Sequence, residues 1–132
     1  MDSSTLQALF TPQTLQQLFP RQRSDEFFDA LFGDAAEGSY DIELGYRGFQ
    51  GNQLTFELLL HERPGRCLAC NLTQGLPQVF SRHPVINLNG LVKAIETLLG
   101  GRALCSAWSL GHTEQRSRSL HVVPLKITLD KA

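Results

Sequence analysis

The sequence lacks any apolar run approaching the roughly 18 residues that a membrane-spanning helix needs. Its first residues, MDSSTLQALF, also lack the basic segment and long apolar stretch of a secretory signal peptide. We therefore expect a protein without a membrane partner that resides in the cytoplasm, where thiols stay reduced.

Motifs that carry chemistry are absent as well. There is no GxxxxGK[ST] or GxGxxG to cradle a phosphate, and no GxSxG or HExxH of the common hydrolases. The four histidines lie at unrelated spacings. The sequence therefore predicts no catalytic residue and no cofactor, although a Cys-His pair that assembles in space stays open.

Positive charge is not in excess. The chain has 12 basic against 13 acidic residues and a pI near 6.4, and Trp108 is its one tryptophan. Four basic residues cluster late in the chain, but nucleic-acid affinity needs several phosphate contacts on a basic surface; the four are Arg102, Arg116, Arg118 and Lys126. We expect no nucleic-acid partner.

The chain has the size and composition of one globular domain. It is 132 residues long, 42% hydrophobic and 19% charged, enough for one core. Residues 1–65 hold 10 acidic and 4 basic residues, whereas residues 66–132 hold 3 acidic and 8 basic ones. This asymmetry either cancels within one fold or lets two copies pair.

Residues 1–38 read as a helical N-terminal segment. Thr11 and Pro12 have the order of a helix cap and first turn, and a second helix is expected from Ser24, as its cap, to Gly33. The apolar face of this second helix must pack on the sheet or on a partner chain, and it is our candidate partner interface: Phe27, Phe28, Leu31 and Phe32.

A three-stranded antiparallel meander is predicted next. Apolar and polar residues alternate over 40–46 and 53–61, with a short Gly51-Asn52 turn between them. Pro64-Gly65 supplies a further turn, so RCLACNL, residues 66–72, becomes the third strand.

The spacing Cys67-x-x-Cys70 falls on this third strand. Residues three apart on a strand point to opposite faces, so the two thiols can neither grip one metal ion nor close a disulfide. We interpret both cysteines as structural and predict no metal site, with Cys67 and Cys70 as the weaker metal or redox alternative.

The connection over 73–84 contains Gly75, Pro77 and Pro84 and is expected to be irregular, pinned by Val79 and Phe80. Loops of this length are often functional. A small-molecule or anion site would use the loop and its flank, with these candidates: Arg82, His83, Asn71 and Thr73.

One long helix over 88–99, capped by Asn87, and two final strands complete the chain. The helix has an uninterrupted apolar stripe: Leu88, Leu91, Val92, Ile95, Leu98 and Leu99. In the next strand Leu104, Trp108 and Leu110 are expected on one side and Cys105 on the other. The connection HTEQRSRS is expected to be flexible. Pro124 predicts that the last strand is an edge strand or carries a bulge.

The order α-α-β-β-β-α-β-β predicts an α+β domain with a five-stranded, mainly antiparallel sheet and one long helix across a face. The N-terminal helices are expected to cover the other face, where Leu59 and Phe49 would be exposed, or to pack on a partner.

The sequence favours a non-catalytic protein-interaction or chaperone-like binding module, as a homodimer or with another protein. The alternative is a small-molecule or anion-binding protein, or an enzyme, that uses the 73–84 loop.

The long helix provides the first test. Ile95→Asp should unfold the domain, because it buries an unpaired charge in the middle of the apolar stripe. Lys93→Ala, on the opposite face of the helix, should leave the melting temperature within a few degrees of the wild type. Equal melting temperatures for the wild type and both variants would show that the face assignment is wrong.

Overall fold

The computed structural model describes residues 3–33, 40–65 and 76–131. Three helices come first, α1 (Ser3–Leu9), α2 (Pro12–Leu18) and α3 (Gln22–Phe32), followed by the strands β1 (Tyr40–Gln50) and β2 (Gln53–Glu62). The helices α5 (Leu76–Arg82) and α6 (Leu88–Leu98) lead to β3 (Ala103–Leu110), β4 (Glu114–Ser117) and β5 (Leu120–Lys131). The predicted α+β class with a five-stranded antiparallel sheet is confirmed.

The sheet has the order β1-β2-β5-β3, and β4 pairs with the first part of β5. The β1–β2 hairpin turns at Gly51 and Asn52, as predicted, with Gln50 opposite Gln53. β2 lies between β1 and β5 and pairs with β5 from Gln53 to His61. The place beside β2 that a meander would give to a third strand is therefore filled by β5. Residues 66–72, with Cys67 and Cys70, lie outside the described residues.

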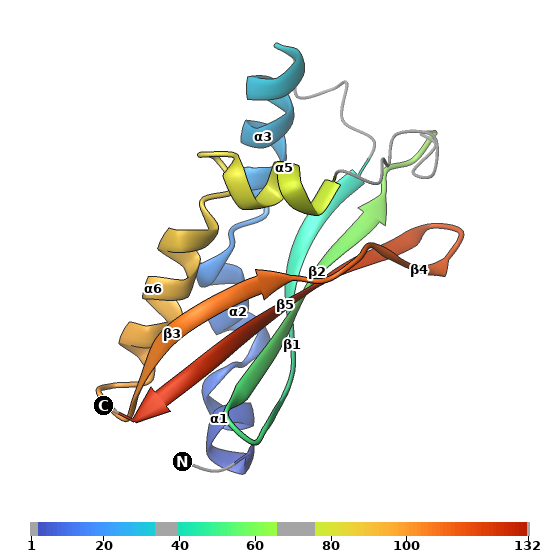
Figure 1. Ribbon diagram of the computed structural model, residues 1–132. Helices are drawn as coiled ribbons and strands as arrows, with labels where there is room; N and C mark the ends of the chain where they lie inside the picture. Colours follow the sequence, from blue (N-terminus) through green and yellow to red (C-terminus); the bar gives the residue numbers. More distant parts are fainter. Residues whose placement is uncertain (1–2, 34–39, 66–75, 132) are drawn as a thin grey trace.

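All described helices that contact the sheet pack on one face of it, which we call the helix face (Figure 1). On β2 this face carries Leu54, Phe56, Leu58 and Leu60, each with 0% exposure. Phe10 of the segment after α1 packs edge-on against Phe56, with ring centroids 5.0 Å apart. The expectation that the N-terminal helices cover the other face is wrong, because they share the helix face with α6.

The opposite face, which we call the open face, carries ion pairs, and Val122 is fully buried on it beside Leu59. The Glu57 carboxylate accepts hydrogen bonds of 2.7 Å from both Arg47 and Arg116, which joins β1, β2 and β4. Burial alone would raise the pKa of Glu57, but the hydrogen bonds from Arg116 and Arg47 outweigh it and lower that pKa. Leu59 is half-buried on this face, and Phe49 packs against the core, so neither needs a cover.

The helix ends agree in part with those predicted from the sequence. Thr11 caps α2 by accepting from the Thr14 amide at 3.2 Å, Asn87 caps α6, and Gly33 ends α3 in the left-handed region, as predicted. Ser24 is not the cap of α3, because the helix begins at Gln22 and Ser24 lies inside its first turn.

The 73–84 segment is more regular than expected. It contains α5, which buries Phe80 completely but leaves Val79 38% exposed. The connection before β5 contains the short strand β4. None of the helices in the described ranges is both long and apolar enough to span a membrane.

A bulge changes which residues of β3 face the core. A shift of register between Cys105 and Ala107 brings Cys105 to the core side with Trp108 and Leu110, while Leu104 is 47% exposed. The extra residue in a bulge reverses the alternation that a regular strand would keep.

Pro124 lies in a central strand, so the edge prediction for β5 is wrong. Its carbonyl accepts from the Gly111 amide at 2.9 Å, which shows that the polar backbone groups of Pro124 point away from β2. On that side the pairing with β3 ends at Leu125 and the pairing with β4 begins at Val122. The missing N–H therefore faces the break between β3 and β4, where no ladder bond is lost.

This break provides the second test. A Cβ on Gly111 would lie 2.7 Å from Cγ of the Pro124 ring, whereas a Cβ on Gly48 would meet nothing within 4 Å. Gly111→Ala should lower the free energy of unfolding by about 1–3 kcal/mol through overpacking. Gly48→Ala should change it by less than about 0.5 kcal/mol. Urea denaturation measures both, and equal stabilities would contradict the close approach.

Candidate functional site

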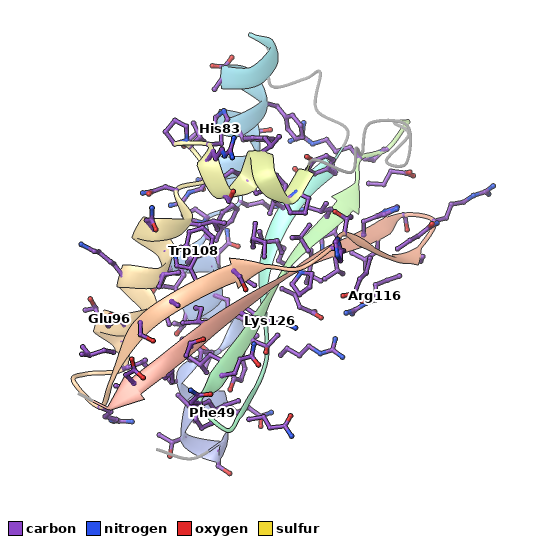
Figure 2. All side chains as sticks on the ribbon, in the orientation of Figure 1. Phe49, His83, Glu96, Trp108, Arg116 and Lys126 are labelled. Carbon is purple, nitrogen blue, oxygen red and sulfur yellow. The ribbon has the colours of Figure 1, made fainter. Side chains whose placement is uncertain are left out.

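Of the four residues predicted to bind a small molecule or anion, the structure describes Arg82 and His83. Arg82, the last residue of α5, is exposed. The His83 ring packs edge-on against Phe27 at 4.8 Å, and its Nδ1 accepts from the Val85 amide at 3.2 Å, at the end of the molecule near α3 and α5 (Figure 2). These contacts give His83 a structural role. Asn71 and Thr73 lie outside the described residues.

The predicted partner interface is partly buried within the chain. Phe27 is 0% and Phe28 3% exposed, and they pack against Phe80 and Tyr40. This is the intramolecular one of the two placements that the sequence left open. A partner interface there stays a prediction that would require α3 to leave the core. The side chains of Leu31 and Phe32 lie outside what the structure describes.

Cys105 is the free cysteine that the structure describes. Burial and the nearby Glu96 carboxylate raise the pKa of Cys105 to about 11, so the thiol stays protonated near neutral pH. Within the described ranges no group of three or more His, Cys, Asp or Glu side chains is placed to hold a metal ion.

Three adjoining clefts of about 310, 300 and 350 Å³ lie along the side of β1 that does not pair with β2. Gln16 of α2 lines all three. We call this surface the β1 groove. Its lining residues are Pro12, Leu15, Gln16, Arg21, Gln22, Asp25, Asp41, Ile42, Glu43, Leu44, Gly45 and His61.

Ion pairs hold the upper wall of the groove in place. The Arg63 guanidinium lies 2.7 Å from an Asp25 carboxylate oxygen and 3.0 Å from one of Asp41, and it also lies over the Phe28 ring. Because Asp25 belongs to α3 and Asp41 to β1, this cation ties the helix to the strand. His61 and Glu43 form a second, more exposed pair at 3.2 Å.

The backbone of Ile42, on the outer edge of β1, is already hydrogen-bonded to a side chain. Ser24 is fully buried, and its Oγ accepts from the Ile42 amide at 2.8 Å and donates to the Ile42 carbonyl at 3.5 Å. The hydroxyl thus takes the place that the backbone of a further strand would take. Backbone groups point to the same side at every second residue, so those of Leu44 and Tyr46 also point away from β2.

A second outer strand, β3, is closed in the same manner. The Glu96 carboxylate of α6 accepts from the Cys105 amide at 3.0 Å, and Asn89 accepts from the Trp108 indole at 3.0 Å, which holds α6 against β3 (Figure 2). β1 and β3 also carry one bulge each. Proteins blunt exposed sheet edges with such devices to prevent unspecific pairing.

The sequence contained little signal for this site. Gln16 is an ordinary exposed helix residue, and Asp41 and Glu43 read as the solvent side of a strand. Their position beside the groove depends on β1 being an outer strand of the sheet, whereas Pro124 had indicated that β5 was the edge strand. The odd placement of Ser24, buried inside a helix turn, is visible only in the fold.

The Ser24–Ile42 contact provides the third test. Ser24→Ala leaves the buried Ile42 amide unpaired, which should lower the free energy of unfolding by about 1–3 kcal/mol. The Ile42 amide should also exchange faster with deuterium. Ser4→Ala, at an exposed serine of α1, is the matched control and should change neither. An unchanged Ile42 exchange rate in Ser24→Ala would contradict the contact.

In comparisons with known proteins, no protein-family model, no curated protein and no solved structure matches the chain.

Proposed function

We propose that the chain is a non-catalytic protein-interaction module that binds an extended polypeptide segment in the β1 groove. The observation that carries the proposal is the location of the groove. It runs beside the outward-facing backbone of Leu44, with Gln16 on its far wall. Because Leu44 is only 3% exposed, an extended segment would add to β1 as a further strand once the side chains that cover Leu44 move aside, and the Gln16 amide would bond the backbone on its other side.

The expected affinity is modest. The outward N–H and C=O groups of Leu44 and Tyr46 allow at most four backbone hydrogen bonds, since Ser24 holds Ile42 and the bulge after Tyr46 ends the regular edge. At about 0.5–1.5 kcal/mol each, they contribute about 2–6 kcal/mol before the cost of ordering the segment. Binding therefore depends on side-chain contacts, which is typical of transient recognition.

A second copy of the chain is the other occupant that the sequence suggests. The acidic first half and basic second half favour an association between copies, and a homodimer in the cytoplasm stays a prediction. The alternative of a small-molecule or anion site around 73–84 has less support, because His83 is engaged in contacts that hold α3 and α5 together.

The fourth test places a large side chain in the β1 groove. Gln16→Trp should weaken binding of peptides selected from a random-sequence display library by about tenfold or more, because the indole occupies the strand position. Gln17→Trp, one residue along the same helix and also exposed, is the matched control and should bind as the wild type does. Fluorescence polarisation measures affinity, and NMR should show amide shift changes at Leu44 and Tyr46.

Selected peptides that bind Gln16→Trp as tightly as the wild type would contradict the groove as the site. Light scattering on the same variants decides about the second copy. If the wild type is a dimer and Gln16→Trp alone is a monomer, the natural occupant is another copy of this chain.

A further inference from the structure

The outer edge of β4 is open. All four of its residues are exposed, and the strand follows the end of β3 along the same side of β5, at the outer end of the β4–β5 hairpin (Figure 1). On β1 and β3 an edge amide is bonded by the side chain of Ser24 or Glu96. On β4 no described side chain takes that place, so a further strand can approach this edge without displacing one.

The backbone groups of Gln115 point to this edge. The Pro124 carbonyl accepts from the Gly111 amide, so the backbone of Pro124 faces the side of β5 on which β3 and β4 lie. Backbone groups alternate in direction along a strand, and β5 pairs with β2 without a shift of register, so Val122 faces the same side. Val122 lies opposite Glu114, which therefore bonds β5. The N–H and C=O of the next residue, Gln115, then point outward.

β4 carries one charge of each sign on the open face of the sheet. Glu114 lies opposite Val122, which belongs to that face, and Arg116 bonds Glu57 there. The Arg116 side chain is 36% exposed, and Glu57 engages its Nη2 at 2.7 Å. A guanidinium has five N–H donors, so Nε and Nη1 of Arg116 can bind a second carboxylate. The charges of β4 thus lie on either side of Gln115.

Two copies of β4 are complementary in one arrangement. In an antiparallel pair centred on Gln115, this residue lies opposite its counterpart in the other copy, and the two exchange two backbone hydrogen bonds. Glu114 of each copy then lies opposite Arg116 of the other, on the same face. Oppositely charged residues at facing positions stabilise adjacent strands, whereas like charges destabilise them. A twofold axis repeats the contact, so the pair gains two such ion pairs.

A strand of arbitrary sequence fits this edge less well. β4 has four residues, and the bulge between Gln115 and Ser117 interrupts regular pairing. Short length, charge and a bulge are features with which proteins prevent unspecific pairing. An arbitrary strand would gain only a few backbone hydrogen bonds, whereas a second copy adds two ion pairs. The edge of β4 therefore favours a second copy.

We propose that the chain forms a weak homodimer by antiparallel pairing of β4 with β4 of a second copy. The two five-stranded sheets then join into one continuous sheet, with both open faces on the same side. This contact does not involve the β1 groove, so it goes beyond the proposed function and does not depend on it.

The fifth test exchanges the two charges. Sedimentation equilibrium measures the self-association of the full chain up to millimolar concentration. Glu114→Arg sets arginine against arginine and Arg116→Glu sets glutamate against glutamate, so each variant alone should associate about tenfold more weakly than the wild type. An equimolar mixture of the two variants restores both oppositely charged pairs and should associate about as tightly as the wild type.

Matched controls make the same changes of net charge elsewhere. Glu26→Arg and Lys93→Glu alter exposed residues of α3 and α6, outside β4. Each control alone, and their equimolar mixture, should associate as the wild type does. If they weaken association as much as the β4 variants do, the effect is one of net charge and the β4 contact is overturned.

A backbone variant tests the edge without changing a charge. Gln115→Pro removes the outward N–H and leaves the pairing of β4 with β5 in place, because proline is tolerated where its nitrogen faces away from the ladder. A folded monomer supports the proposal, and association at the wild-type level would overturn it. This variant also decides the matter if Arg116→Glu, which loses its bond to Glu57, does not fold.

The remaining outcomes are equally decisive. A wild type that stays monomeric at millimolar concentration would overturn the dimer. An equimolar mixture of folded Glu114→Arg and Arg116→Glu that stays monomeric would overturn the twofold arrangement about Gln115. A dimer that Gln16→Trp disrupts and Gln115→Pro does not would place the contact in the β1 groove and overturn the contact at β4.

Discussion

The complete burial of one face of β2 is the constraint on which the rest of the structure depends. Leu54, Phe56, Leu58 and Leu60 have no exposed surface, and β2 is paired on both sides. A strand that is buried in this manner forces β1 and β5 to present their apolar residues to the same side. It also draws every short N-terminal helix onto that side, because helices of seven residues are not stable without tertiary packing.

The open face and the sheet edges follow from this one-sided arrangement. On the open face, the Glu57 carboxylate is neutralised by two arginines. The helices on the other face reach the outer strands, where Ser24 and Glu96 each take up one edge amide. The sheet is thus protected against unspecific pairing at two points, and Leu44, which lies between Ser24 and the bulge, is only 3% exposed.

In the proposed function, the short length of the β1 edge between Ser24 and the bulge would favour recognition over aggregation. A long flat edge would pair with almost any exposed strand, whereas a window centred on Leu44 relies on side chains for affinity. The groove offers an apolar wall at Pro12 and Leu15 and a partly unneutralised carboxylate at Glu43. The proposed interaction module would suit weak, reversible binding better than a permanent assembly.

The sequence by itself determined the elements whose signals are local. Periodicity fixed α6 and the buried faces of β2 and β5, and cap and turn residues such as Thr11, Asn87 and Gly51 marked element ends correctly. The tertiary structure alone decided the strand order, the single layer of helices, the bulge that moved Cys105 inward, and the role of Ser24. The physical reason is that pairing between distant strands, and the choice of face for a helix, depend on the summed burial of the whole core. No local pattern encodes that sum, so the β1 groove, which exists only because β1 is outermost, was invisible in the sequence.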